Sequence, residues 1–220
     1  MNRPLRILFT QPIVFTMAIY QAIIFGTNYS LYTNFQAIFG DGYGFSTTQV
    51  GLLYLAPGIG FLVSVWFLIP RIDTIYNALT ARNDDVPKPE FRLPLANIGA
   101  ILVPLSLFWF AWMVEYHLHW AITILSTVFF GLGQITIVNC VQNYYIDSFS
   151  EYAASAIAAG TVFRSIIGGV VPLFAPALFE KVGYGWGISV FGFCAVVLMP
   201  SPVAFYYFGE RVRRSFAVEL

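Results

Sequence analysis

Long apolar runs separated by short polar segments dominate this chain. Six such runs lie near Pro12–Phe39, Thr47–Ile69, Pro94–Val114, Trp120–Tyr145, Ala153–Phe179 and Gly185–Phe208. Each can cross the roughly 30 Å hydrocarbon core of a bilayer, which needs about 20 helical residues. The runs lack the period-two alternation of membrane barrel strands, and only helices or closed barrels satisfy their backbone in lipid. The pattern therefore predicts an all-α integral membrane protein with six transmembrane helices.

The polar connections and the basic residues predict the orientation. The longest connection, residues 70–93, begins with a stretch that could form a short surface helix and ends as a loop rich in acids and prolines. Lys and Arg gather on one side of the predicted spans, at Arg3, Arg6, Arg71, Arg82, Lys88, Arg92, Arg211, Arg213 and Arg214. The other side carries only Lys181. By the positive-inside rule, both termini and the 70–93 loop are cytoplasmic.

Composition supports the membrane assignment. The chain is 58% hydrophobic and only 10% charged, whereas soluble domains carry about a quarter charged residues. The lipid bilayer is therefore the expected main partner. The formal net charge is zero, so nothing in the bulk charge favours a nucleic acid.

Polar side chains form stripes on the first and fourth predicted helices. They share helical spacing and lie within the spans: Gln21, Asn28, Tyr29 and Tyr32 on the first, Gln134 and Gln142 on the fourth. Polar groups in lipid are costly unless they face a neighbouring helix or a wet cavity. For any single amide an interhelical hydrogen bond is the simpler interpretation. Several aligned amides favour a substrate cavity, because transporter substrate sites lie near the bilayer midplane.

Arg164 is the one basic residue inside a predicted span. It lies about 16 Å along the helix from the cytoplasmic end near Ala153, too deep for its side chain to reach water by snorkelling. One interpretation is structural: Arg164 donates to carbonyls freed by an irregularity at Gly168–Pro172 and to amides such as Gln134 or Asn139. The other is a switch, in which Arg164 pairs with an acid or anion in one access state only.

Glycines and prolines suggest close packing and an internal repeat. Gly58 and Gly60 in the second span, like Gly160 and Gly168 in the fifth, would let helices approach closely. The spacing of Gly58, Phe61 and Pro70 matches that of Gly160, Phe163 and Pro172. Because the two spans run in opposite directions, the match fits a three-plus-three inverted repeat. Chance explains three such matches about as well.

Catalytic and metal chemistry find no support in the sequence. Glu115, His117 and His119 share one short loop with no further ligands, so no metal site is expected. The chain has no phosphate-binding glycine loop, nucleophile elbow or paired catalytic carboxylates. We therefore expect no cofactor and no enzymatic activity.

Several sequence blocks in the same order resemble the fungal drug:proton antiporters of the major facilitator superfamily, the multidrug and polyamine type. These blocks are YGFSTTQVGLLYL, KPEFRLP, LFWFAW, QNYYIDSFSEYAASAIAA, FRSIIGGVVPLF and FYYFGERVR. The resemblance implies the C-terminal half of a twelve-helix transporter. Residues 1–11 then resemble the end of the central linker, residues 12–208 form the six-helix bundle, and residues 209–220 form a cytoplasmic tail.

The same resemblance implies export of drugs, toxins or polyamines by alternating access, in exchange for protons and at the plasma membrane. A small organic or cationic substrate and an N-terminal six-helix bundle, absent from this chain, are the implied partners. Proton coupling needs a titratable group, yet no Asp or Glu lies inside a predicted span, and Asp147 marks the cytoplasmic end of the fourth. The coupling acid is therefore expected in the missing bundle. Two alternatives stay open: a non-transporting partner or regulator of a full transporter, and a homodimeric six-span carrier.

Overall fold

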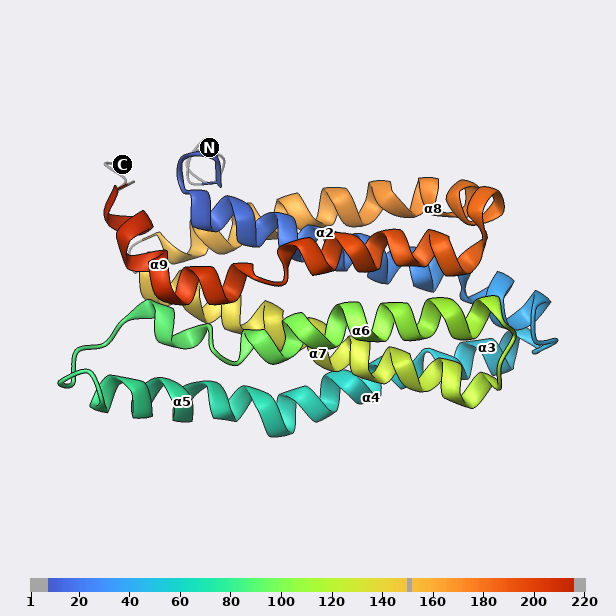
Figure 1. Ribbon diagram of the computed structural model, residues 1–220, viewed down its shortest axis with the longest axis horizontal. Coiled ribbons are helices and arrows are strands. Elements are labelled where there is room, and N and C mark those ends of the chain that lie inside the picture. Colours follow the sequence, from blue (N-terminus) through green and yellow to red (C-terminus); the bar gives the residue numbers. More distant parts are fainter. Residues whose placement is uncertain (1–7, 150–151, 216–220) are drawn as a thin grey trace.

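The computed structural model describes residues 8–149 and 152–215, and the described part contains helices and no strands. The predicted linker segment 1–11 and tail 209–220 thus lie partly outside the described residues. Arg3 and Arg6 lie outside them. The chain order is α2 (Pro12–Phe35), the π-helix η1 (Gln36–Asp41), α3 (Thr47–Leu53), α4 (Leu55–Val63), the π-helix η2 (Ser64–Leu68), α5 (Ile69–Ala81), the short 3₁₀ helix η3 (Pro89–Arg92), α6 (Ala96–Glu115), α7 (Trp120–Ser148), α8 (Ala153–Leu198) and α9 (Ser201–Ser215). Their long axes run roughly side by side (Figure 1).

The long helices pack as neighbours whose order in space differs from their order in the chain. Helix α2 packs on α8, and α6 lies between α7 and α8, while α4 packs against α7. Large aromatic side chains fill the space between them, including Tyr20, Phe35, Phe110 and Tyr145, which are fully buried. The Tyr145 hydroxyl also donates to the Val14 carbonyl at 3.2 Å, joining α7 to α2.

The crossing of α4 and α7 depends on glycine. A Cβ added at Gly60 would overlap the Val128 carbonyl oxygen and lie 2.9 Å from the Leu132 nitrogen, both on α7. One Cβ at Gly131 would lie 2.5 Å from the Pro57 carbonyl oxygen. Close by in sequence, Ser64 and Thr136 share a buried hydrogen bond of 2.8 Å between the two segments. The predicted role of Gly60 in close packing is therefore confirmed, whereas a Cβ at Gly58 would meet nothing within 4 Å.

Helix α8 runs to one end of the molecule and returns, with its reversal visible at the end opposite α9 (Figure 1). The reversal occurs at Gly183, whose φ of 80° and ψ of 168° are not helical. This backbone region is open almost only to glycine. Beyond it, Glu115 of α6 accepts a hydrogen bond from the Gly185 nitrogen at 2.8 Å. A carboxylate here satisfies an amide that a helix start leaves without a partner.

Two sequence-based expectations are corrected by the backbone. The last predicted run, Gly185–Phe208, is not one helix, since α8 ends at Leu198 and α9 begins at Ser201. Pro200 and Pro202 explain the break, because proline lacks an amide donor and clashes with the preceding turn. The expected irregularity at Gly168–Pro172 is absent, and the only non-helical residue within α8 is Gly183. A helix at the start of the 70–93 segment is confirmed as α5.

Four helical stretches within the described residues are long and apolar enough to cross a membrane: Thr47–Ala81, Ala96–Glu115, Trp120–Ser148 and Ala153–Arg213. Large apolar side chains also point outward, with Val197 76% exposed, Leu173 75% and Trp66 70%. So many large exposed apolar side chains need lipid or a partner to cover them. The chain is therefore an integral membrane protein.

Candidate functional site

The predicted polar stripe of α2 begins in the bundle interior. Gln21 is 2% exposed and Asn28 is 6% exposed, although both were expected on a cavity face. Tyr29, 45% exposed, reaches the surface, and Tyr32 is half-buried. The ring of Tyr32 packs edge-on against Tyr54, whose hydroxyl donates to the Tyr32 carbonyl at 2.7 Å. The stripe therefore changes from buried amides to more accessible aromatic residues along the helix.

Arg164 of α8 faces α2. Its Nη1 donates to Gln21 Oε1 at 3.1 Å, and its guanidinium carbon lies 4.7 Å from the centre of the Phe25 ring. Gln21 and Phe25 are one helical turn apart, so both present to the same neighbour. The expected partners on α7 are wrong. Asn139 donates to the Ile135 carbonyl instead, and Arg164 donates to Gln21 of α2.

An arginine at this depth is costly. Insertion measurements place a central arginine at about 2.5–3.5 kcal/mol unfavourable. One hydrogen bond to a neutral amide and one cation–π contact offset part of this cost, since each contributes roughly 0.5–2 kcal/mol. Among the described residues, no carboxylate forms an ion pair with Arg164. The half-buried guanidinium is therefore held by an amide and an aromatic ring, without a described acid.

The predicted residues of α7 do not join this pair. Gln134 is 4% exposed, and its Oε1 has no hydrogen-bond partner among the described residues. Gln142 is half-buried. Buried amide atoms without partners also occur on α2, at Gln21 Nε2 and Asn28 Oδ1. Unpaired buried polar atoms cost free energy, so both predicted stripes carry amide atoms whose burial is not offset by a hydrogen bond among the described residues.

A pocket of about 240 Å³ opens between α2 and α8 beside Arg164. Its lining consists of Phe25, Tyr29, Ser165, Gly168 and Gly169. Only Tyr29 was predicted as a site residue. Phe25 could have been found from its position one turn after Gln21, but Ser165 and the two glycines read from sequence as ordinary residues of a membrane helix. The pocket adds an aromatic and apolar surface to the Arg164–Gln21 pair.

At the end that carries most of the bases, Asp147 of α7 belongs to a cluster with Arg92. Arg92 Nε donates to Asp147 Oδ2 at 2.6 Å, and Nη1 donates to Asp73 of α5. The guanidinium also stacks 3.9 Å over the Tyr76 ring. Burial lowers the pKa of Arg92, but the hydrogen bonds to Asp147 and Asp73 raise it by more, so the pKa lies above its ordinary value. The cluster joins α5, η3 and α7.

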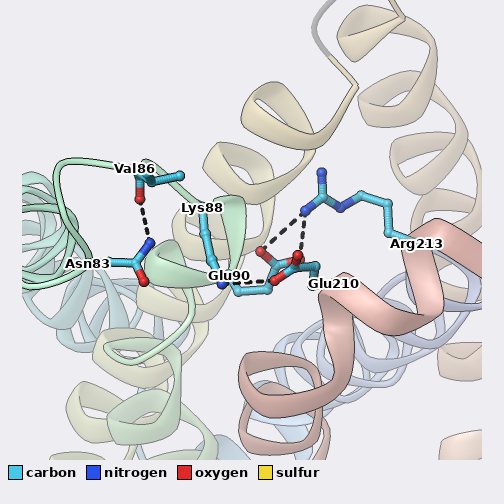
Figure 2. A network of polar contacts seen from close by, with 6 residues as sticks. All are labelled: Asn83, Val86, Lys88, Glu90, Glu210 and Arg213. Atoms are coloured by element: carbon cyan, nitrogen blue, oxygen red, sulfur yellow. Dashed lines mark hydrogen bonds and ion pairs between the residues drawn. The ribbon is translucent and has the colours of Figure 1, made fainter.

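A second set of ion pairs at the same end attaches the loop before α6 to α9. Figure 2 shows Lys88 beside Glu210 and Arg213 beside Glu90. The nitrogen–oxygen distances are 2.9 Å for Lys88–Glu210 and 3.2 Å for Arg213–Glu90. Glu90 is only 2% exposed, so this acid is held inside the protein by its partner. Exposed pairs contribute little, but a buried acid depends strongly on its base.

Comparison with known proteins decides the family. Residues 2–172 match the model of the Major Facilitator Superfamily. The chain belongs to the major facilitator superfamily. Its relatives in the superfamily include the MFS-type transporter penM of Penicillium rubens, 42% identical over 97% of this chain and 42% of the relative.

Other relatives in the superfamily match this chain over a similar share of their length. The MFS transporter cpaT of Aspergillus oryzae is 41% identical over 96% of this chain and 43% of its own length. The efflux pump vrtL of Penicillium aethiopicum is 40% identical over 96% of this chain and 42% of its own length. The chain thus spans less than half the length of the curated relatives that it matches. No solved structure matches the chain at a significant level.

The relatives that match the chain are named as transporters and efflux pumps. Within the part of the chain that the structure describes, no group of three or more His, Cys, Asp or Glu residues could hold a metal ion. The resemblance noted in the sequence is therefore confirmed at the level of the superfamily and of fungal transporters and efflux pumps.

Proposed function

We propose that this chain forms one six-helix bundle of an exporter of small organic molecules that works by alternating access. The names of its relatives, which include efflux pumps, support export. The chain spans about 42% of the relative penM, as expected for one of two bundles. The observation that carries the proposal is the Arg164–Gln21 pair beside an aromatic pocket, because polar groups are placed deep in membrane helices chiefly for substrate or ion pathways.

Three groups of helices together support six membrane crossings. α2 has the length of a membrane span, at 24 residues, and its polar stripe lowers its apolar character. The stretch Ala153–Arg213 reverses at Gly183 and so provides two crossings. With the three remaining apolar stretches the total is six. The matching positions of Gly58 and Gly160 fit a three-plus-three inverted repeat in this bundle.

Charge supports a cytoplasmic location for the end that carries Arg92. The described bases Arg71, Arg82, Lys88, Arg92, Arg211 and Arg213 belong to this end, while Lys181 belongs to the reversal in α8. By the positive-inside rule the basic end faces the cytoplasm. Both termini are then cytoplasmic, and we place the protein in the plasma membrane.

Proton coupling is proposed for the complete transporter rather than for this bundle. Coupling requires a group that gains and loses a proton within the membrane. Several described acids lie at the helix ends and in loops, for example Asp41, Glu115 and Asp147. Asp73 lies within α5, but it is 74% exposed and is paired with Arg92 at the basic end. The coupling acid is therefore assigned to the other bundle, which would also supply the second wall of the cavity.

Expression of residues 1–220 in a yeast strain without its own drug exporters tests this assignment. We expect no efflux of a fluorescent drug above the empty vector, with or without an imposed pH gradient. Joining the chain to the N-terminal bundle of a relative such as penM should restore gradient-dependent efflux. Gradient-dependent efflux by the chain alone would contradict the proposal and favour a homodimeric carrier. Loss of efflux by the joined protein despite normal abundance would favour a non-transporting partner.

A further inference from the structure

The surroundings of Arg164 point to the charge of the transported molecule, an inference that rests on the proposed function. We propose that Arg164 and the pocket between α2 and α8 bind an anionic aromatic group of the substrate, such as a carboxylate on a ring system. The site combines one cation, one orienting amide and one aromatic cavity.

Most of the hydrogen-bond donors of Arg164 are not used by described residues. A guanidinium carries five N–H donors in a fixed planar fork, which suits a carboxylate. Its one hydrogen bond to a described residue uses Nη1, and the acceptor is Gln21 Oε1. The flat face of the guanidinium lies over Phe25, so the remaining donors point along its edge. The side chain is half-buried rather than enclosed. Gln21 therefore orients Arg164 without consuming its capacity to bind an anion.

The counter-charge of Arg164 is missing from the described residues. The described ion pairs all lie at the end that carries Arg92. Other described acids, such as Asp41 and Glu180, belong to the opposite end. A cationic substrate placed here would be repelled by Arg164, with no acid nearby to compensate. An anionic substrate would provide the partner that the helix lacks.

The pocket supplies a surface for the rest of the molecule. Phe25 belongs both to the pocket and to the cation–π contact with Arg164. Tyr29 stands across from Gly168, where an added Cβ would come within 3.2 Å of its ring. At Gly169 an added Cβ would meet nothing within 4 Å, so that side is open. Aromatic walls favour a flat, apolar ligand, and Ser165 offers one hydroxyl beside them.

Three probes with the same ring system and different charges test the proposal: 2-naphthoate, 2-naphthylmethanol and 2-naphthylmethylammonium. Titration calorimetry would be performed on the purified chain in phosphatidylcholine nanodiscs. We expect naphthoate to bind about tenfold or more tightly than the alcohol, because charge-assisted hydrogen bonds are roughly twice as strong as neutral ones. The ammonium probe should bind more weakly than the alcohol. Equal affinities for naphthoate and the alcohol would overturn the proposal.

Two variants separate the charge from the cavity. Arg164→Gln should reduce the preference for naphthoate over the alcohol to about one. Gly169→Phe should fill the pocket and weaken binding of both probes while leaving Arg164 in place. Its matched control is Gly58→Phe, since an added Cβ at Gly58 also meets nothing within 4 Å, and that variant should bind normally. If Arg164→Gln does not fold, the comparison of Gly169→Phe with Gly58→Phe still tests whether the pocket binds naphthoate. Full naphthoate binding by Gly169→Phe would refute the site.

A lipid headgroup is the other source of an anion. The titration would be repeated in nanodiscs that contain phosphatidylserine. Unchanged naphthoate affinity supports a substrate site, whereas competition by the anionic lipid would overturn the assignment. Because binding is measured without transport, its failure is distinct from that of the proposed function. If naphthoate does not bind but the joined transporter shows efflux, only the anion site is contradicted. If naphthoate binds but the joined transporter shows no efflux, only the exporter assignment is contradicted.

Discussion

Gly60→Ala is expected to deplete folded protein severely, whereas Gly58→Ala, on the same helix, is expected to be neutral or slightly stabilising. At Gly60 the new methyl group would overlap the backbone of α7 at Val128, which cannot move aside as a side chain could. Overpacking of this kind costs about 1–3 kcal/mol or more. At Gly58 the methyl group meets no atom within 4 Å, and alanine favours the helix over glycine by roughly 1 kcal/mol.

The two glycine variants can be compared through a fluorescent protein fused to the C-terminus. Size-exclusion profiles of detergent extracts give the amount of monodisperse protein, and heating series give its thermal midpoint. We expect Gly60→Ala to lose most of the monodisperse peak and Gly58→Ala to retain it. Equal profiles for the two variants would show that α4 and α7 do not cross where the structure places them.

Arg92→Ala is the second substitution with a large expected effect. It removes hydrogen bonds to Asp147 and Asp73 and the stacking on Tyr76. A hydrogen bond to a charged group contributes about 1.5–3 kcal/mol. The Asp147 carboxylate is 23% exposed and that of Asp73 is 74% exposed, so the contact with Asp147 is the larger of the two. We expect a net loss of roughly 2–3 kcal/mol and a thermal midpoint lower by several degrees.

Matched variants identify which part of the Arg92 cluster matters. Arg92→Lys keeps the charge but lacks the planar fork that reaches two carboxylates, so an intermediate midpoint is expected. Asp147→Asn should destabilise more than Asp73→Asn, in line with their exposures. The prediction fails if Arg92→Ala melts like the unmodified protein, or if Asp73→Asn is the more damaging of the two.

The deficit of Arg92→Ala is also expected to be the same from about pH 6 to about pH 8. The hydrogen bonds to Asp147 and Asp73 hold the pKa of Arg92 above its ordinary value. A base with a raised pKa contributes its full stabilisation below its ordinary pKa and loses it only as the pH rises through the folded-state value. For arginine this window lies far above neutral pH.

The helices were predictable because apolar runs of membrane length leave the backbone few alternatives. Even the helix at the start of the 70–93 segment follows from its sequence. The break between Leu198 and Ser201 was not predicted, because the apolar run continues through it. Pro200 and Pro202 are the sequence signal that indicates this break. The reversal at Gly183 falls within the connection expected between the fifth and sixth runs. The length of α5 as a continuation of η2 was not expected, because it depends on tertiary packing.

The site was predictable in kind but not in its contacts. The sequence indicated that Arg164 needs a neighbour, since a charged side chain in a membrane helix is costly. It could not indicate that Gln21 is that neighbour, because α2 and α8 are distant in the chain and become adjacent only on folding. Gln134 was predicted to lie beside them for the same reason. Helical periodicity shows which residues share a face, but it does not show which other helix packs against that face. Gly58 and Gly60 likewise differ only in what lies across from them.

The most direct measurement of the central claim, a six-crossing bundle with its Arg92 end in the cytoplasm, is cysteine labelling in intact cells. Cys140 and Cys194, both free thiols, would first be replaced by alanine. Single cysteines at Asp41, Leu118 and Lys181 should then react with a membrane-impermeant maleimide from outside. Cysteines at Asp85 and Ser215 should react only after the membrane is permeabilised. Labelling of Asp85→Cys and Lys181→Cys from the same side would contradict the account.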